Sequence, residues 1–424
     1  MSRTVYDVCV VGAGVIGSAA ARHASSLVED KQILLIGPSE PKDRSSTDLF
    51  AAHYDEGRLT RQAPPDAIRG LMTQRSIERY RDIEDASVDH IAGVSFFDEC
   101  GFLQIGPDGE ASMNKSRKVA EHPQIKLKYR DFGAVEAGKK FPYIHFRAGE
   151  VGLHSEKNSG NINPRKLLQA QLTLAERNGC AVVDDSVVSI SPPSRDGGLY
   201  EILTGRGHSY LARNVLLATG AFTCSRDLLP KNKTPDIINL KKTVILVEIS
   251  EEEYQAKLTT MPTMVVYRMN PNDKRDKKYW TYIMKPLRYS DGKLYIKLGG
   301  WGDRKAPEAN TSQELSDWYR IRGDPVIAKE LMTIWRDVFP GLKPGNVVMD
   351  GCVTSHTPND RPYIDMVQPG LGVAIAGCAT GAMCSDELGR IAARMILKKS
   401  WDEDYPRDEF KYRVKPRVEV ESKL

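Results

Sequence analysis

The sequence predicts an α/β protein in which a parallel, doubly wound layer is combined with a separate, mostly antiparallel sheet. Two units of apolar strand, glycine turn and helix favour the parallel layer, one at residues 5–23 and one at residues 371–398. Residues 239–301 favour the antiparallel sheet, because they alternate in polarity or carry β-branched and aromatic residues between turn signals. The two parallel units lie far apart in the chain, so we expect a domain assembled from discontinuous segments.

Composition and charge indicate a globular protein with a sizeable core. The chain has 424 residues, of which 41% are hydrophobic, and a formal net charge of +4. Basic residues are scattered except at residues 274–278, so we expect no nucleic-acid partner. No apolar run approaches the ~20 residues of a membrane span, and no secretory pattern opens the chain, so we expect no membrane partner. Seven cysteines without a CxxC motif or clustered histidines predict free thiols and no metal site.

Three glycines follow the first apolar run, at Gly12, Gly14 and Gly17. In a dinucleotide-binding unit the first takes a tight turn, the second leaves room for a pyrophosphate, and the third lets the helix pack closely on the strand. The helix then points its N-terminus at the phosphate. A second apolar run at residues 32–36 completes the strand, helix and strand that this motif requires. The sequence therefore predicts a dinucleotide site here.

The segment after the second predicted strand departs from the usual dinucleotide pattern. Gly37 occupies the place of the acid that takes the ribose hydroxyls, which leaves Ser39 or Glu40 as its substitute. Farther along, Arg58 and Arg61 lie three residues apart in a polar stretch. They are either solvated surface charges or fixed, planar donors for a carboxylate, and the residues alone leave both interpretations open.

The remaining segments divide between helices and strands. Apolar residues with helical spacing predict helices over residues 66–86, 165–178 and 312–339. Residues 180–190 are expected to form a strand that returns to the parallel sheet, and residues 347–365 are expected to be extended.

The chain ends in Ser422-Lys-Leu424, the tripeptide that the peroxisomal import receptor recognises at a C-terminus. The preceding residues 401–421 are charged and predict an exposed tail. An arbitrary polar end is the alternative explanation of so short a match. We expect a peroxisomal protein with this receptor as a partner.

Three motifs, in this order along the chain, resemble those of FAD-dependent amine and amino-acid oxidases. They are the N-terminal glycine unit, the strand end Ala218-Thr-Gly-Ala-Phe222, and the block from Cys352 to Asp365. The nearest branch contains monomeric sarcosine oxidase, pipecolate oxidase and the fructosyl amino-acid oxidases. The resemblance implies a monomer with a discontinuous FAD-binding domain and an interleaved substrate domain. The FAD-binding domain is expected at residues 1–92, 151–229 and 343–400, the substrate domain at residues 93–150 and 230–342, and the tail at residues 401–424.

The block that begins at Cys352 implies a covalent cofactor. In this branch a cysteine six residues before a Thr-Pro proline carries the flavin through a thioether, and Cys352 stands six residues before Pro358. A thiol suits this role because it is a soft nucleophile once it is ionised beside cationic groups. A small, buried core residue is the alternative interpretation of Cys352.

The resemblance also assigns the catalytic residues. Lys297, in Ile-Lys-Leu-Gly, resembles a strand lysine over the flavin ring, whose fixed charge stabilises oxygen as it takes up electrons. Strand alternation alone leaves an outward-facing lysine open. The resemblance further implies that Arg58 lies near the ring and that Arg61 binds a substrate carboxylate.

Other cofactor contacts are implied at the glycine turn, the following strand ends and the last turn of the nucleotide unit. Met383 departs from the branch, because sarcosine-type members have a lysine there, in Gly-His-Gly-(Phe/Tyr)-Lys. A methionine cannot pair with a carboxylate, which leaves a larger, less acidic or differently held substrate open. The remaining implied contacts are Ala13, Val15, Ile16, Ser39, His53, Val188, Gly220, Gly381 and Ala382.

The resemblance implies oxidation of an amine in an N-substituted amino acid or a related amine. Hydride passes to FAD, water hydrolyses the resulting imine, and O2 takes the electrons and becomes hydrogen peroxide. Two alternatives stay open: a flavin dehydrogenase with a different electron acceptor, and an FAD-binding protein without activity.

Overall fold

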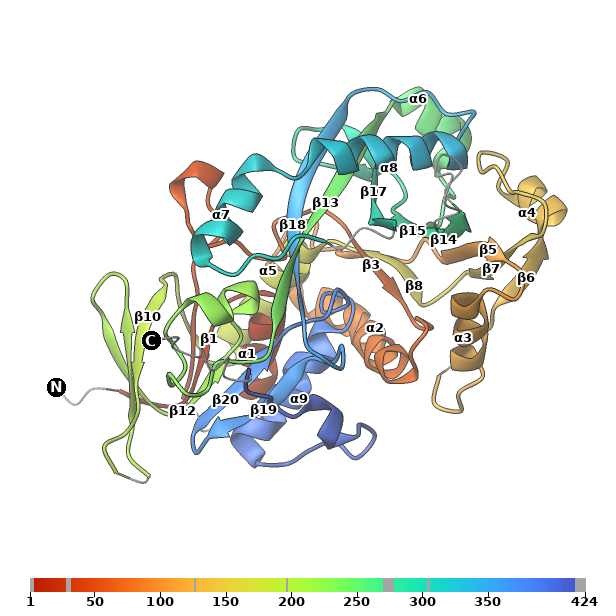
Figure 1. Cartoon of the computed structure of the whole chain (residues 1–424). Helices are drawn as coiled ribbons and strands as arrows, with labels where there is room; N and C mark the ends of the chain where they lie inside the picture. Colours follow the sequence, from red (N-terminus) through yellow and green to blue (C-terminus); the bar gives the residue numbers. More distant parts are fainter. Residues whose placement is uncertain are drawn as a thin grey trace, which may run out of the picture.

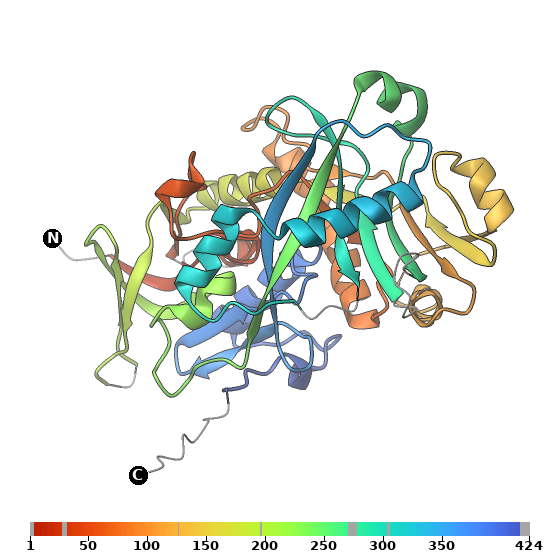
Figure 2. The same cartoon turned by 45° about the horizontal axis from the view of Figure 1, so that its top comes forward.

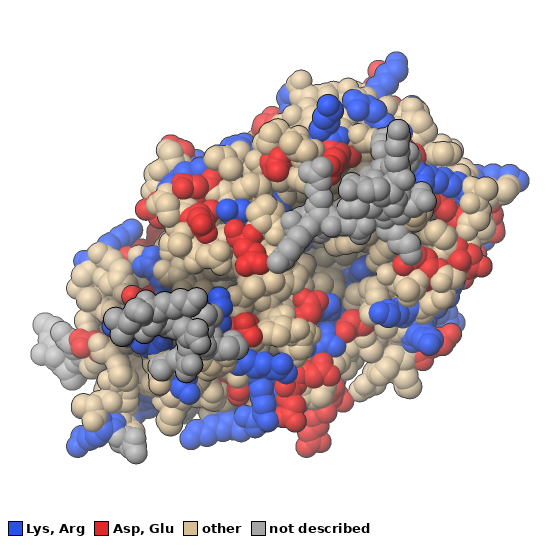
Figure 3. Space-filling view, viewed as in Figure 1, with Lys and Arg blue, Asp and Glu red and all other residues tan. Residues whose placement is uncertain are grey.

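The structure is a computed structural model that describes residues 4–27, 32–125, 127–195, 197–269, 278–302 and 306–415. The C-terminal tripeptide at residues 422–424 and residues 274–277 of the basic stretch lie outside these ranges. In the described part of the chain, none of the helices combines the length and the apolar character that a bilayer crossing requires. Lys and Arg side chains are interspersed with Asp and Glu over the described residues of the face in Figure 3.

A first sheet forms the parallel layer. Its parallel strands are, in spatial order, β9 (Ala181–Val183), β2 (Ile33–Ile36), β1 (Val5–Val11), β12 (Ser209–Leu217) and β20 (Leu371–Ile375). Antiparallel strands extend it: β19 (Tyr363–Gln368) beside β20, and β11 (Tyr200–Thr204) and β10 (Val187–Ser191) beyond β12. Val8, Cys9 and Val10 are completely buried, as expected for a parallel strand covered on both faces.

Four helices pack together beside this sheet (Figure 1): α1 (Val15–Leu27), α2 (Ala67–Ser87), α5 (Pro164–Arg177) and α9 (Ser385–Lys398). Local sequence fixes where they begin. Asp66 caps α2 by accepting a hydrogen bond from the backbone N–H of Arg69, and Asn163 caps α5 in the same way just before Pro164. The predicted helices at residues 66–86 and 165–178 therefore agree with the structure within one residue at each end.

A second sheet forms the mostly antiparallel layer. Its strands are, in spatial order, β18 (Val347–His356), β13 (Ile238–Ile249), β17 (Leu294–Gly302), β15 (Lys278–Ile283), β14 (Thr263–Met269), β5 (Phe102–Pro107), β7 (Glu150–Ser155) and β6 (Arg130–Gly133), with β16 (Leu287–Arg288) beside β17. The long strands β13 and β18, at one end of the second sheet, lie at the centre of the molecule (Figure 1). A short third sheet joins β3 (Arg58–Arg61), β8 (Ser159–Ile162) and β4 (Phe97–Asp98).

Helix α8 (Pro325–Val338) lies across the second sheet (Figure 2) and buries Leu331, Trp335 and Val338 in its core. The single helix predicted over residues 312–339 is two helices, because Arg322 and Gly323 have positive φ angles and end α7 (Ser312–Ile321). The other short elements are η1 (Arg44–Ser46), α3 (Ala111–Ala120), α4 (Ala134–Lys140), η2 (Gly220–Ser225), α6 (Glu251–Glu253), the π turn η3 (Tyr254–Leu258) and η4 (Arg407–Phe410).

The expected domain ranges stay a prediction, and they do not follow the sheets at two places. Strands β7 and β18 pair in the second sheet, although residues 151–155 and 347–356 fall in the ranges expected for the FAD-binding domain. The expectation of an exposed tail is wrong for residues 401–410, because Tyr405 and Phe410 are buried against the same core as α9.

Candidate active site

A cavity of about 840 Å³ lies between the first sheet and the second. Its wall is built from the glycine turn after β1, the loop of residues 49–58, the end of β12, strands β13, β17 and β18, and the turn of residues 376–383. Ligand sites are usually of this size and concave. The segments that the sequence singled out for chemistry therefore meet around one space.

The glycine turn has the shape that a phosphate cradle needs. Gly12 has a φ angle of +107°, and a Cβ there would lie 2.5 Å from the carbonyl oxygen of Ala218. A Cβ on Gly17 would lie 1.8 Å from the carbonyl oxygen of Gly12, so α1 can pack this closely only with glycine. A Cβ on Gly14 would meet nothing within 4 Å, and Gly14 lines the cavity. The turn therefore leaves open space where a pyrophosphate would approach the helix N-terminus.

Neither substitute for the ribose acid lines the cavity. The backbone N–H of Ser39 donates to Asp184 (2.8 Å), and Glu40 forms two hydrogen bonds with Arg165, each 2.7 Å long. Gly37 itself packs on the turn, because a Cβ there would lie 2.3 Å from the backbone nitrogen of Ala13. Glycine at this position is thus a packing requirement of the glycine turn.

Lys297 and Arg58 meet at one carboxylate, that of Asp55. Lys297 is 2% exposed; its Nζ pairs with Asp55 Oδ2 and donates to the carbonyl oxygen of Gly57 (3.1 Å). Arg58 Nη1 pairs with the same carboxylate oxygen, and Nη2 donates to the carbonyl oxygen of Ala52 (2.6 Å). Tyr289 donates its hydroxyl to Asp55 Oδ1 (3.0 Å). We call Asp55, Arg58 and Lys297 the cavity triad; all three line the cavity.

The charges of the triad shift one another's pKa values. Burial raises the pKa of Asp55, but Arg58 and Lys297 outweigh it and hold that pKa below its ordinary value. Burial and the charge of Arg58 lower the pKa of Lys297, and Asp55 opposes them. Burial lowers the pKa of Arg58, but the charge of Asp55 outweighs it and leaves that pKa raised. With all three groups charged, the triad carries two positive charges and one negative charge.

Arg61, at the end of β3, lines the cavity and has an N–H donor without a hydrogen-bond partner among the described residues. Its Nη1 lies 3.4 Å from Gln104 Oε1, and its guanidinium lies 4.8 Å from the centroid of the Phe102 ring. Its Nε is buried and has no hydrogen-bond partner among the described residues. Gln104 is completely buried, and Ser116 donates its hydroxyl to the same Oε1 (3.0 Å). This arrangement holds a guanidinium that is able to accept a carboxylate as partner.

Cys352 faces the cavity from β18, directly across the strand pair from Lys242 of β13. Trp318 ties the pair together, because its indole N–H donates to the carbonyl oxygens of Cys352 (3.0 Å) and Lys242 (3.2 Å). Burial raises the pKa of the Cys352 thiol, and the charges of Arg58 and Lys297 oppose it. Burial lowers the pKa of Lys242 to about 8.

The turn after β20 closes another wall of the cavity in a strained conformation. Ala376, Cys378 and Ala379 have φ angles of +59°, +48° and +60°, a region that residues other than glycine rarely adopt. Strain of this kind concentrates at ligand sites. Met383 follows, 3% exposed, and its carbonyl oxygen accepts a hydrogen bond from Tyr80 (3.2 Å).

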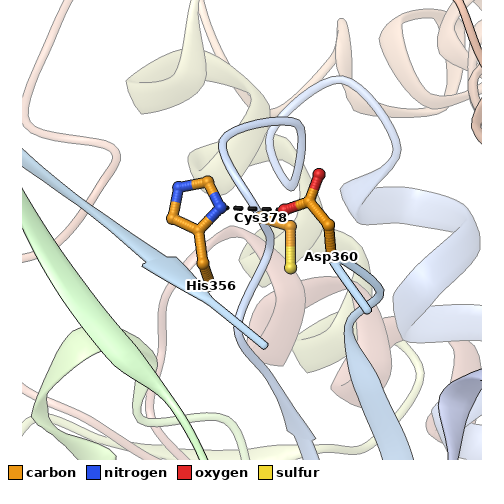
Figure 4. A group of neighbouring side chains, drawn as sticks. All are labelled: His356, Asp360 and Cys378. Atoms are coloured by element: carbon orange, nitrogen blue, oxygen red, sulfur yellow. Dashed lines mark hydrogen bonds and ion pairs between the residues drawn. The ribbon is translucent and has the colours of Figure 1, made fainter. Parts of the chain in front are cut away.

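A group of possible metal ligands lies at the edge of this turn: His356, Asp360 and Cys378 (Figure 4). Their polar atoms already have protein partners. The imidazole of His356 is bonded to Asp360 Oδ1 (2.8 Å) and to Thr354 Oγ1 (3.0 Å). The Cys378 thiol donates to the carbonyl oxygen of Ala376 (3.1 Å). A backbone hydrogen bond, from the N–H of Cys378 to the carbonyl oxygen of Ser355 (3.0 Å), joins this turn to β18.

Most of the residues assigned to the cofactor by resemblance meet at the cavity. Gly17, Ser39 and Val188 do not. Val188 is 42% exposed, and its neighbour Val187 lines the cavity instead. His53 lines the cavity with its Nδ1 unpaired among the described residues, and burial, Arg165 and Arg58 lower its pKa to about 3. The residues that line it as assigned are Gly12, Ala13, Gly14, Val15, Ile16, His53, Arg58, Gly220, Cys352, Gly381, Ala382 and Met383.

Sequence reasoning missed Asp55, Tyr289 and Lys242. Asp55 stands three residues before Arg58, a spacing that fits an ion pair but gives no sign of burial. Tyr289 has no local signal. Lys242 sits in an expected strand beside Lys241, where alternation leaves open which of the two lysines faces Cys352.

Comparison with known proteins gives matches over most of the chain. A model of the family described as FAD dependent oxidoreductase matches residues 7–395. Monomeric sarcosine oxidase of Streptomyces avermitilis is 28% identical over 220 residues, so the match spans about half of each protein (51% of this chain and 52% of that one). Peroxisomal sarcosine oxidase of Homo sapiens is 24% identical over 370 residues, 86% of this chain and 84% of that protein.

A solved structure shares the fold. NikD, described as an unusual amino acid oxidase essential for nikkomycin biosynthesis, has a TM-score of 0.74 at 18% identity. The superposition covers 97% of this chain and 98% of that one. The mixed α/β fold expected from the sequence is thereby confirmed.

Proposed function

The chain belongs to the family of FAD dependent oxidoreductases, and from this premise we propose that it oxidises the C–N bond of an N-substituted amino acid or related amine with O2 as the electron acceptor. One observation carries the proposal: a buried lysine and two arginines, Lys297, Arg58 and Arg61, line the same cavity as the glycine turn. These are the charges that oxygen chemistry and carboxylate binding require.

The residues present fit FAD. Gly14 leaves the open cradle for a pyrophosphate, and the cavity continues from there to the triad and Cys352. Bound FAD supplies a two-electron acceptor for the amine and a donor of those electrons to O2. Ala13, Gly14 and the N-terminus of α1 would hold the pyrophosphate, because their backbone N–H groups lie at the positive end of a helix dipole, whereas the N–H of Gly12 donates to the carbonyl oxygen of Ile36 (2.8 Å).

Arg61 is proposed to bind the substrate carboxylate. Its buried Nε lacks a partner among the described residues, so a carboxylate would satisfy a donor that the protein leaves unpaired. Met383, in the place of the expected lysine, adds apolar surface to the cavity in place of a second cation. The substrate would thus be held by one guanidinium and by apolar contacts. Sarcosine, named in two of the relatives, is an N-methyl amino acid and fits this class.

The triad is proposed to act on the protons and charges of the reaction. Its excess positive charge disfavours an ammonium ion in the cavity, so the substrate amine would react in its neutral form. Lys297 would stabilise the negative charge that develops on O2 as it becomes hydrogen peroxide. A buried, fixed ammonium suits this role because it needs no reorganisation during the reaction.

Cys352 is proposed to bind FAD covalently. Its position in the cavity wall supports the proposal, and the charges of Arg58 and Lys297 partly offset the rise that burial causes in the pKa of its thiol. Acid denaturation tests it: native protein should keep its yellow colour in the pellet, and Cys352→Ala protein should release it. Flavin that stays fixed in the variant would exclude Cys352 as the attachment site.

We also propose a monomer located in peroxisomes. The tripeptide Ser422–Leu424, together with the relative named peroxisomal sarcosine oxidase, supports the location and the import receptor as a partner. The relative named monomeric sarcosine oxidase supports the monomer.

Oxygen consumption tests the function. Purified protein, with FAD supplied, would be assayed with sarcosine, pipecolate, other N-alkyl amino acids and fructosyl amino acids, and hydrogen peroxide would be measured. We expect peroxide in proportion to oxygen consumed with at least one of them, and a much slower reaction with O2 in Lys297→Met protein. Reduction of the flavin by substrate with slow turnover by O2 would indicate a dehydrogenase. No reduction by any of these amines would indicate a binding protein.

A further inference from the structure

The cavity triad contains one acid, Asp55, to which the proposed function assigns no role. Asp55 accepts hydrogen bonds from Lys297, Arg58, Tyr289 and the backbone N–H of Glu56, so each of its oxygens is engaged. Its side chain is 15% exposed and lines the cavity. The acid thus sits between the two cations that would face the flavin.

We propose that Asp55 is a positioning residue that sets the charge presented to the cofactor, because its carboxylate holds Lys297 and Arg58 side by side and cancels one of their two charges. The inference rests on the proposed function in one respect, that flavin fills the cavity. Two cations on one carboxylate oxygen would otherwise repel each other. The pairs come from distant segments, the loop of residues 53–58 and strand β17, so the acid also fixes how the loop meets the sheet.

The formal charge of the triad can be counted for the native protein and for each variant. The native triad carries +1, Asp55→Asn carries +2, Lys297→Met carries 0, and the double variant Asp55→Asn/Lys297→Met carries +1 again. Positive charge near a flavin favours its reduced, more negative form, so the reduction potential should follow this count. A merely structural acid would not make the double variant return to the native potential.

The reduction potential of bound flavin, measured against a reference dye near pH 6, tests whether the potential follows the charge of the triad. We expect Asp55→Asn to raise the ratio of reduced to oxidised flavin about tenfold and Lys297→Met to lower it about tenfold, each about 30 mV for a two-electron couple. The double variant should lie at the native value. If it matches Lys297→Met instead, the proposal is overturned. Asp55→Glu, which restores the charge, should return the potential toward the native value.

Asp350→Asn is the matched control. Asp350 also lines the cavity, but it pairs with Arg44 (2.6 and 3.0 Å) and touches neither cation of the triad. Its removal takes a negative charge from the cavity wall without parting Lys297 from Arg58, so we expect it to shift the potential much less than Asp55→Asn does. An equal shift would show that any carboxylate of the wall sets the potential, and would overturn the role of Asp55. If Asp55→Asn does not fold because Lys297 and Arg58 then repel each other, the double variant removes that repulsion. Its reduction potential still shows whether the flavin responds to the charge of the triad.

A second measurement needs no flavin. Without Asp55, the charge of Arg58 should lower the pKa of Lys297 further, so the unfolded chain would bind a proton that the folded chain lacks over a wider range below the ordinary lysine value. The free energy of unfolding of Asp55→Asn should then rise with pH below the ordinary lysine value near 10.4, relative to the double variant. Parallel pH profiles would contradict the proposal. The groups that face Lys297 are Asp55, Arg58, Cys352 and Tyr282.

The two measurements separate the two ideas. Protein that binds no flavin but shows the pH effect would refute the proposed function, and with it a charge presented to flavin, and would support only the coupling of Asp55 to Lys297 and Arg58. Protein that binds flavin, but whose reduction potential is the same with and without Asp55, would leave the proposed function intact and refute the charge-setting role of Asp55.

Discussion

The molecule holds buried carboxylates among cations in two regions that differ in charge balance. One is the cavity triad. The other, which we call the helix cluster, lies at the N-terminus of α9, where Asp386 and Glu387 are completely buried. Among the described residues, its ion pairs join four arginines with four carboxylates: Arg22, Arg75, Arg79 and Arg390 with Asp386, Glu387, Asp402 and Asp404.

The difference indicates what each region does. In the helix cluster the charges balance, and Asp386 also accepts hydrogen bonds from Gln171 (3.0 Å) and His23 (3.2 Å), so its capacity is filled by protein. The cluster joins α1, α2, α5 and α9 with the segment after α9. The triad, in contrast, has an excess positive charge and lines a cavity. A balanced cluster stabilises a fold, whereas an unbalanced one beside open space is available to a ligand.

The largest effect should come from breaking the helix cluster. Asp386→Ala leaves Arg22 and Arg79 without the carboxylate they share, and we expect a loss of about 3–5 kcal/mol in the free energy of unfolding. Urea denaturation measures it. Asp404→Ala is the control, because Asp404 is 40% exposed and pairs only at the surface, so its loss should be much smaller. Equal losses of unfolding free energy in the two variants would show that the buried carboxylate stabilises the fold no more than the exposed one.

A smaller effect is expected in the cavity, and on catalysis instead of stability. Arg61→Met removes the proposed carboxylate partner, so kcat/KM for an N-alkyl amino acid should fall about 100-fold, equivalent to about 2.7 kcal/mol. The same amine without a carboxylate should react at an unchanged rate. Gln104→Leu removes the acceptor beside Arg61 and should cost about fivefold, mainly in KM. Equal losses with both substrates would show that Arg61 does not bind the carboxylate.

The parts of the fold that the sequence predicted well depend on local signals. The glycine turn follows from Gly12, Gly14 and Gly17, and the caps Asp66 and Asn163 fix two helix starts. The break between α7 and α8 was missed although local residues mark it: Gly323 has a positive φ angle after α7, Asp324 caps α8, and Pro325 begins that helix. The assignment of β7 and β18 depends on pairing across the sheet, which local sequence does not encode.

The site was predictable only where a residue type itself implies the chemistry. Lys297 and Arg58 were identified, but Asp55 was not, since its burial depends on a strand more than 200 residues away. Val188 was assigned in place of Val187 because β10 shifts its register between Val187 and Ser189, which changes which side chains face inward. Glu40 was a candidate for binding the ribose, but its carboxylate pairs with Arg165 of α5, a residue far along the chain.

A last effect, confined to alkaline pH, tests the comparison at the edge of the cavity. Burial lowers the pKa of Lys242 to about 8, so between pH 8 and the ordinary lysine value near 10.4 the unfolded chain binds a proton that the folded chain lacks. Stability due to this lysine should therefore rise with pH over that range. The difference in free energy of unfolding between native protein and Lys242→Met should grow from pH 8 to pH 10. Lys242→Arg, which keeps its charge throughout, should lack the native rise, and a rise equal to the native one in both variants would exclude Lys242 as its source.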